Sequence, residues 1–220
     1  MTKTTYVLGA LASVAVLAAG GLWLARSAGL EALSIAALAE TADDATILPD
    51  VVMGQEDAPV TVIEYASYTC PHCAVWHKEV LPPLKADYID TGKVKFIHRE
   101  VYFDRYGLMA GTVASCGGVP KYYAISGMIY DTQSDWIGDG KEATIGANLR
   151  KIGLKAGLSA EAVNACLSDN DRAQAMVATF QKHATDDAID STPTILVNGE
   201  KYPNMSYADL KAIIDAKLAE

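Results

Sequence analysis

The hydrophobic pattern that starts at residue 60 predicts a buried strand followed by a turn and a helix. The strand formers are Val60, Val62 and Ile63. A single acid, Glu64, follows them, and Ser67 and Thr69 then mark the turn. An acid in a strand that is buried on both faces costs free energy unless it has a task. Glu64 is therefore a candidate functional residue.

The helix after this turn is predicted to begin at Cys70 and to end or kink at Pro82 and Pro83. A second strand is predicted from Val94 to Val101. Two strands joined by a helix form a β-α-β unit, which is parallel and right-handed in nearly all proteins. The two strands are therefore expected to be parallel neighbours in one sheet.

Residues 104–190 contain no convincing strand and are predicted to be helical, with breaks at glycine-containing turns. Thr194 to Val197 then predict a strand, and Asn198-Gly199 is a strong signal for a hairpin turn. Ser206 is the predicted N-cap of a last helix with one apolar stripe. The pattern predicts an α/β fold in which a helical insertion, at about 104–190, separates a β-α-β half from a β-β-α half.

Length and composition indicate one globular domain with an N-terminal extension. The chain has 220 residues, of which 50% are hydrophobic and 20% are charged. The net charge of -9 argues against nucleic-acid binding, because nucleic-acid-binding proteins normally present a basic face. The expected partners are therefore proteins or small molecules.

The segment 1–27 is predicted to be a membrane anchor or a signal sequence. The stretch from Tyr6 to Ala25 carries no charge and is long enough to span a bilayer. It exceeds the usual apolar core of a signal peptide, so an uncleaved inner-membrane anchor is favoured over a removed signal. Both alternatives export the remainder, which predicts a periplasmic location. Residues 28–47 are predicted to be a linker with a short helix, and 48–220 the folded domain.

The motif Cys70-Pro71-His72-Cys73 carries the candidate chemistry of the chain. Cys70 falls at a helix N-cap, and Pro71 occupies the first helical position, where proline is favoured. The free N–H groups and the dipole at this terminus stabilise a thiolate, so we expect a lowered pKa for Cys70. Cys73 lies one turn further on, at a spacing that allows a disulfide to open and close. The motif predicts a redox-active pair.

A structural or zinc-binding cysteine pair is the alternative interpretation. Zinc would need two more ligands, and Cys116 and Cys166 stand alone in the sequence. His77 shares a helix face with Cys73 but lacks partners as a metal ligand, so we expect it to line the site; tuning of the thiols is its less favoured role. No phosphate loop or metal cluster stands out, so no cofactor and no metal are predicted.

Two segments resemble the DsbA-type thiol:disulfide oxidoreductases of the thioredoxin superfamily. The first is the cysteine motif together with Glu64, six residues before Cys70. The second is the stretch 191–199, Ser-Thr-Pro-Thr-Ile-Leu-Val-Asn-Gly. The resemblance covers about 48–220 and implies a thioredoxin fold whose inserted helices roof the reactive cysteine.

The resemblance also implies roles for individual residues. Pro193 is expected to follow a cis peptide bond, and Thr192 to face the cysteine pair. Glu64 is expected to lie beneath the pair and to accept the proton of Cys73 as this thiol attacks a mixed disulfide. A stabilised Cys70 thiolate would make the disulfide a strong oxidant.

The function implied is that of an exported enzyme that introduces disulfides into secreted proteins through a mixed-disulfide intermediate. Its expected partners are folding exported proteins with cysteine thiols and a membrane redox partner that reoxidises the pair. A reductase or isomerase of the same fold is one alternative. A thiol-dependent, metal-binding assembly chaperone is another, although no Met- or His-rich tract supports it.

Further predictions concern single side chains. Cys116 and Cys166 are expected to form a structural disulfide, because an exported chain with four cysteines and one local pair leaves two partners; two buried free thiols are the alternative. His72 is expected to stabilise the Cys70 thiolate by a hydrogen bond or a positive charge, with an exposed bystander as the alternative.

The last predictions concern the surroundings of the cysteine pair. His98 and Glu100 are expected to line the space beneath it. Five aromatic side chains are available for an apolar substrate groove, although core packing is the favoured interpretation for each of Trp76, Tyr102, Tyr122, Tyr123 and Trp136.

Overall fold

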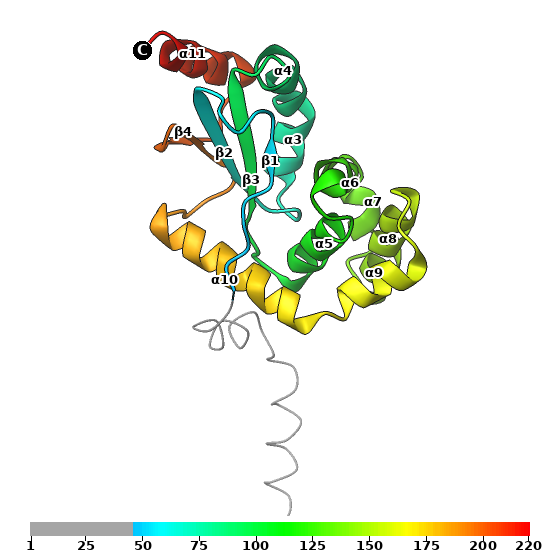
Figure 1. Ribbon diagram of the computed structural model, residues 1–220. Coiled ribbons are helices and arrows are strands. Elements are labelled where there is room, and N and C mark those ends of the chain that lie inside the picture. The colour runs from blue at the N-terminus through cyan, green and yellow to red at the C-terminus, as the bar shows by residue number, and fades with distance from the viewer. Residues whose placement is uncertain (1–45) are drawn as a thin grey trace, which may run out of the picture.

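The computed structural model describes residues 46–220, so the predicted anchor or signal and most of the predicted linker lie outside the described residues. Within this part of the chain, a five-stranded sheet has the strand order β1-β3-β2-β4-β5 (Figure 1). The strands are β1 (Val52–Met53), β2 (Val60–Ala66), β3 (Val94–Glu100), β4 (Thr194–Val197) and β5 (Glu200–Pro203). β2 and β3 are parallel, as predicted, and the other neighbouring pairs are antiparallel.

Two groups of helices flank the sheet. The helices that belong to its two halves are α3 (Pro71–Glu79), α4 (Leu81–Leu84), the π-helical turn η2 (Lys85–Ile89) and α11 (Tyr207–Leu218). Those of the insertion are α5 (Arg105–Ser115), α6 (Val119–Asp131), α7 (Gln133–Ile137), α8 (Glu142–Lys155), α9 (Ala160–Leu167) and α10 (Asn170–Asp186). In Figure 1 helices α5 to α9 lie beside the sheet, and the long α10 crosses below. The predicted fold, an α/β thioredoxin fold with a helical insertion between its halves, is confirmed.

The apolar alternation of β2 explains how the sheet is covered. Val60 and Val62 belong to the core that Trp76 of α3 and Leu210 of α11 help to fill. Tyr65 belongs to a separate cluster, which includes residues of β4 and α10. Because successive strand residues face opposite sides, Glu64 points to the same side as Val62, toward α3. The strand thus carries its one acid into the core beneath the first helix.

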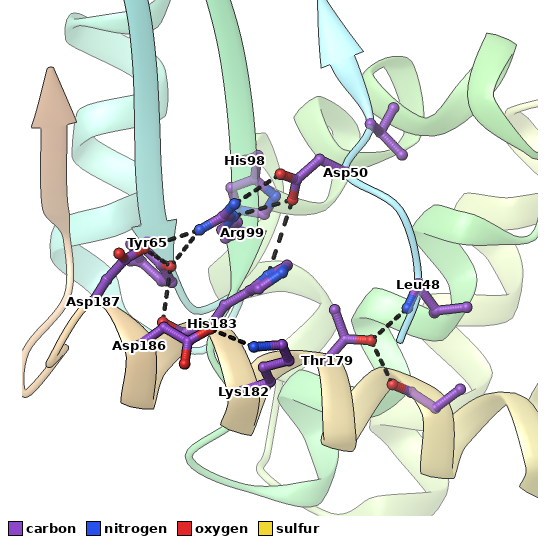
Figure 2. Close-up of polar contacts among 12 residues, drawn as sticks. Leu48, Asp50, Tyr65, His98, Arg99, Thr179, Lys182, His183, Asp186 and Asp187 are labelled. Carbon is purple, nitrogen blue, oxygen red and sulfur yellow. Dashed lines mark hydrogen bonds and ion pairs between the residues drawn. The ribbon is translucent and has the colours of Figure 1, made fainter. Parts of the chain in front are cut away.

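The short strand β1 was not predicted, and it fixes the N-terminal segment of the domain. Val52 lies opposite Ile97 in an antiparallel pair with β3. Just before it, the amide of Leu48 donates to the Thr179 hydroxyl of α10 at 2.8 Å (Figure 2). A two-residue strand carries no readable periodicity, so only the partner strand, far away in the sequence, reveals it.

The predicted turn and cap residues adopt the expected conformations. Asn198 and Gly199 both have positive φ, 49° and 82°, which is the geometry that selects this dipeptide in tight hairpins. Ser206 accepts a hydrogen bond from the amide of Asp209 and caps α11, and Ser159 caps α9 in the same way.

The five aromatic candidates for a substrate groove pack mainly in the core. Among them, four are buried and Tyr123 is partly buried: the buried ones are Trp76, Tyr102, Tyr122 and Trp136. Across residues 46–220, none of the helices has both the length and the apolar character that crossing a membrane requires.

Candidate active site

The turn between β2 and α3 presents Cys70 and buries Cys73. Cys70 is the N-cap of α3, with an extended backbone, and Pro71 follows at the first helical position. Both cysteines are free thiols; Cys70 is partly exposed, whereas Cys73 has no exposed surface. The local sequence thus makes one sulfur accessible to a partner and hides the other behind it.

The two thiols have opposite pKa shifts. The pKa of Cys70 falls to about 5, because the Cys73 thiol, the Thr192 side chain and the backbone N–H groups of Cys73 and His72 donate to its thiolate, which outweighs its partial burial. The pKa of Cys73 is raised far above its ordinary range by its hydrogen bond to Cys70, by burial and by the nearby Glu64 carboxylate. At neutral pH Cys70 is therefore a thiolate and Cys73 a thiol.

The loop before β4 closes the site from the other end of the chain. The peptide bond between Thr192 and Pro193 is cis, and the Cys70 thiol lies 3.6 Å from the Thr192 carbonyl oxygen, which can accept its hydrogen bond. The structure thus places Thr192 beside Cys70. A polar backbone group thus lies next to the accessible sulfur.

His72 lies between the two cysteines in the sequence and is exposed. The contribution of His72 to the lowered pKa of Cys70 named above comes from its backbone N–H. The role predicted for its imidazole ring stays a prediction.

Glu64 lies beneath the pair with no exposed surface. Its Oε2 is 2.8 Å from Nε2 of His77, which α3 brings over the strand. Its Oε1 has no hydrogen-bond partner, one of two such buried side-chain atoms among residues 46–220. Burial raises the pKa of Glu64 to about 8 and lowers the pKa of His77 to about 3. Near neutral pH the contact therefore joins a protonated acid, as donor, to a neutral imidazole.

His98 lies beside Glu64 on the neighbouring strand, as expected for a residue beneath the site. The two are direct partners in the parallel register of β2 and β3. Nδ1 of His98 is 2.8 Å from the Tyr122 hydroxyl, and its Nε2 is 3.0 Å from the Tyr130 hydroxyl. Burial lowers the pKa of His98 to about 3, so this imidazole is also neutral.

The sequence left His77 without partners for metal binding, and the structure corrects this. The nearest ligand atoms of Glu64, His77 and His98 all lie within 4.8 Å of one another. Two imidazoles and one carboxylate are a donor set that zinc accepts. Glu64 and His77 bond each other, and both ring nitrogens of His98 bond tyrosine hydroxyls. Among the facing atoms Glu64 Oε1 has no partner, so the cluster is explained as a hydrogen-bonded network.

Glu100 forms the far end of this polar interior. Its Oε1 accepts hydrogen bonds from Tyr122 at 2.8 Å and from Tyr68 at 3.2 Å, and its Oε2 accepts one from Tyr102. Burial raises its pKa. Sequence reasoning expected Glu100 here and named Tyr102 and Tyr122 only as groove or core residues. It missed their hydrogen bonds, although Tyr122, Ser126 and Tyr130 recur every four residues on one face of α6. Buried hydroxyls at that spacing were the signal for a polar helix face.

Cys116 and Cys166 are joined by a disulfide within the insertion. The bond links the end of α5 to α9, with the two Cα atoms 5.9 Å apart. It lies in the helical insertion and involves neither cysteine of the motif.

A thioredoxin fold with a cysteine pair at the start of its first helix and a cis proline beside it defines the thioredoxin-like class. The family model described as Thioredoxin matches residues 46–216, and the chain belongs to this family. The solved structure of alpha-DsbA1 from Wolbachia pipientis is similar, with a TM-score of 0.71 and 26% identity; the match covers 79% of this chain and 94% of that one. The resemblance to DsbA-type proteins is thereby confirmed.

Two sequence relatives support the same family. A Rickettsia bellii protein, whose name assigns it provisionally to the protein-disulfide oxidoreductases, is 32% identical over 172 residues, which are 78% of this chain and 65% of that protein. Disulfide bond formation protein D of Bacillus subtilis is 29% identical over 180 residues, 76% of each chain. The chain therefore spans slightly less than two thirds of the length of the Rickettsia relative.

Proposed function

We propose that this protein is an exported thiol:disulfide oxidase that introduces disulfides into other exported proteins. The observation that carries the proposal is the asymmetry of the pair: Cys70 is accessible and ionises with a pKa of about 5, while Cys73 is buried and stays protonated. A stabilised thiolate favours the reduced pair, and this makes the Cys70–Cys73 disulfide oxidising. The names of the relatives support the same reaction class.

The reaction proceeds by two exchanges at Cys70. A substrate thiolate attacks Sγ of Cys70, the Cys70–Cys73 bond breaks, and the sulfur of Cys73 leaves and takes up a proton. A second substrate thiolate then attacks the substrate sulfur bound to Cys70, so the substrate disulfide forms and Cys70 leaves as a thiolate. Two electrons pass from the substrate to the cysteine pair. A disulfide of a membrane redox partner must accept these electrons to restore the oxidised pair.

The surface beside Cys70 supports a protein as the substrate. A hollow of about 450 Å³ between α3 and the segment before α11 is lined by residues that include His72, Val75, Trp76 and Met205. Val75 is a half-exposed apolar side chain of α3, the helix that Cys70 caps. A segment of folding polypeptide could cover this apolar surface while its thiol reaches Cys70.

The proposed location is the periplasm, with residues 6–25 as an inner-membrane anchor and a removed signal as the alternative. The uncharged length of this segment supports the proposal. A tagged full-length chain that sediments with membranes and resists extraction by carbonate would support the anchor. Release of a shortened, soluble chain into the periplasm would favour the cleaved signal.

The experiment that tests the reaction measures the equilibrium of the Cys70–Cys73 pair with glutathione. The Cys70–Cys73 pair of an oxidase should remain reduced in mixtures that leave thioredoxin-like reductases oxidised. Its reduction potential should lie near the oxidising end of the range from about -270 to -120 mV. The oxidised protein should also restore activity to a reduced, unfolded disulfide protein. A potential near the reducing end would instead assign a reductase, and a Cys70→Ala variant that still oxidises substrates would exclude the mechanism.

A further inference from the structure

The buried position of Cys73 creates a problem of proton supply. Opening the Cys70–Cys73 disulfide requires Cys73 to gain a proton and closing it requires Cys73 to lose one, yet neither Cys73 nor Glu64 has any exposed surface. The direct way out leads past Cys70. A redox partner joined to Cys70 by a mixed disulfide covers that side during the step in which Cys73 must release its proton. A second route to solvent is therefore needed.

A set of polar side chains leads from Glu64 across to β3 and along it to Glu100, the strand partner of Ala66. His98 is the direct strand partner of Glu64, and their nearest polar atoms lie within 4.8 Å, a gap that one water molecule spans. From His98 the hydrogen bonds continue over 2.8 Å to the Tyr122 hydroxyl and over another 2.8 Å to Oε1 of Glu100. Each group on this path can both accept and donate a proton when it is uncharged.

The path ends at a cavity. His98, Tyr122 and Glu100 all line a hollow of about 230 Å³ that also borders the N-terminal segment at Leu48 and helix α10. Glu100 and Arg99 are only partly buried there, so the far end of the path meets solvent. Cys70 is not among the residues that line this cavity.

We propose that Glu64 exchanges protons with solvent through His98, Tyr122 and Glu100, by way of the cavity bordered by Leu48 and α10. The proposal rests on the proposed oxidase function and deepens it. When Cys73 attacks a mixed disulfide on Cys70, the carboxyl group of Glu64 takes up the proton of its thiol and gives one proton on along the path to solvent, so that Glu64 itself stays protonated. When Cys73 leaves as a thiolate, the same path returns a proton.

The groups that face this path are consistent with its use. Near Glu64 they are His77 of α3 and Tyr130 of α6, which stack with ring centroids 3.9 Å apart. Near Glu100 they are Tyr68, Tyr102 and Arg172. Burial keeps the imidazoles and hydroxyls of this region uncharged. A proton therefore crosses from Glu64 to Glu100 through uncharged groups, and the fixed positive charges of Arg99 and Arg172 lie at the cavity where the path ends.

The test separates the proton-dependent step from the first attack. Reduced protein is mixed with oxidised glutathione, and samples are quenched in acid at intervals. Mass spectrometry then measures the amount of the protein–glutathione adduct in each sample. Formation of the glutathione adduct reports the attack by the Cys70 thiolate, which needs no proton from the interior. Decay of the adduct reports the attack by Cys73, which must lose one.

Tyr122→Phe and Glu100→Gln interrupt the path with little change in volume. In both variants we expect adduct decay to slow by about tenfold or more, since a positioned proton transfer contributes roughly 10²- to 10⁴-fold. Adduct formation and the final equilibrium with glutathione should stay unchanged, because a proton path alters rates in both directions equally. A larger solvent deuterium isotope effect on decay should accompany the loss.

The matched control is Tyr123→Phe, which removes a neighbouring hydroxyl of α6 that bonds the carbonyl of Val51 at 2.6 Å. The proposal would be overturned if the glutathione adducts of both path variants decayed as fast as the adduct of this control. The proposal would also be overturned if the equilibrium with glutathione shifted enough to account for the slower decay, because the residues would then have a structural role. If one variant does not fold, the other decides. Failure of the wild-type adduct to decay faster than that of Cys73→Ala would refute the proposed function instead.

Discussion

Glu64 and His77 share a hydrogen bond of 2.8 Å in a region that excludes solvent. The contact joins the acid of β2 to an imidazole of α3, and both groups are uncharged near neutral pH because burial opposes either charge. Because this carboxyl group keeps its proton in the folded protein and loses it in the unfolded chain, the folded protein binds more protons above the pKa of an unfolded glutamate. The folded protein must therefore lose stability as the pH rises past that pKa.

This predicts how Glu64→Gln changes stability with pH. The pKa of Glu64 is raised from 4.5 to about 8, so the wild type should lose stability between these pH values and reach a plateau above the upper one. The variant cannot ionise and escapes this loss. Urea unfolding should give equal free energies near pH 4.5 and an advantage to the variant, of more than about 1.4 kcal/mol, at pH 8.5.

The control for this comparison is Glu79→Gln, which changes an exposed acid in the same helix that carries His77. We expect its difference from the wild type to be the same at both pH values. An advantage of Glu64→Gln that did not grow with pH would mean that the buried carboxyl is already ionised near neutrality.

The lowered pKa of Cys70 predicts the opposite pH dependence for the reduced protein. The pKa falls from 9 to about 5, so the stabilisation is complete above pH 9, declines as the pH falls and is lost below pH 5. The raised pKa of Cys73 adds a dependence only above pH 9. The unfolding free energy of the reduced form, relative to that of the oxidised form, should therefore fall steadily from pH 9 to pH 5. A constant difference over this range would show that the thiolate is not stabilised.

His72→Gly separates the ring of His72 from its backbone. The variant keeps the N–H that donates to the Cys70 thiolate, and Thr192 and Cys73 also remain. We expect a rise of less than about one unit in the pKa of Cys70, measured by the ultraviolet absorbance of the thiolate. A rise of two units would make the imidazole the chief stabiliser, and an identical titration would make it a bystander.

The sequence predicts features that depend on neighbouring residues better than contacts between distant ones. The strand–helix unit, the hairpin at Asn198-Gly199 and the cap at Ser206 depend on neighbouring residues, and local patterns were sufficient to predict them. The partners of Glu64 depend on strand register and on how helices cross. His77 and His98 reach it from 13 and 34 positions away in the sequence, so no local pattern pairs them with the acid. The sequence placed His77 and His98 near the cysteine pair, but their direct contacts with Glu64 emerged only from the structure.

The disulfide between Cys116 and Cys166 is predicted to contribute to stability and not to turnover. It closes a loop with a sequence separation of 50, which corresponds to about 4 kcal/mol on the chain-entropy model. The double variant Cys116→Ser and Cys166→Ser should lose about this much unfolding free energy in urea. The potential of the Cys70–Cys73 pair should change little. A large shift in that potential would show that the insertion communicates with the reactive pair.

The last prediction concerns Arg99, which ties the N-terminal segment to the sheet and to α10. Its guanidinium contacts Asp50 with two nitrogens, at 2.8 and 3.1 Å, and reaches Tyr65 at 2.7 Å and Asp187 at 2.9 Å (Figure 2). All four side chains are partly or fully buried, so solvent screens these contacts less than exposed ion pairs. The fork geometry is specific to arginine, because an ammonium group cannot serve both carboxylates and the hydroxyl in the same way.

Arg99→Lys should therefore lower the unfolding free energy by about 1–3 kcal/mol, even though it keeps the charge. The control is Lys182→Ala, which breaks the exposed pair with Asp186 that also appears in Figure 2; it should cost less than about 0.5 kcal/mol. Hydrogen exchange should show faster opening of β1 in the arginine variant alone, because Asp50 lies just before that strand. Equal stability losses in the two variants would mean that the Arg99 contacts are no stronger than a surface ion pair, and that β1 is held by its strand pairing with β3.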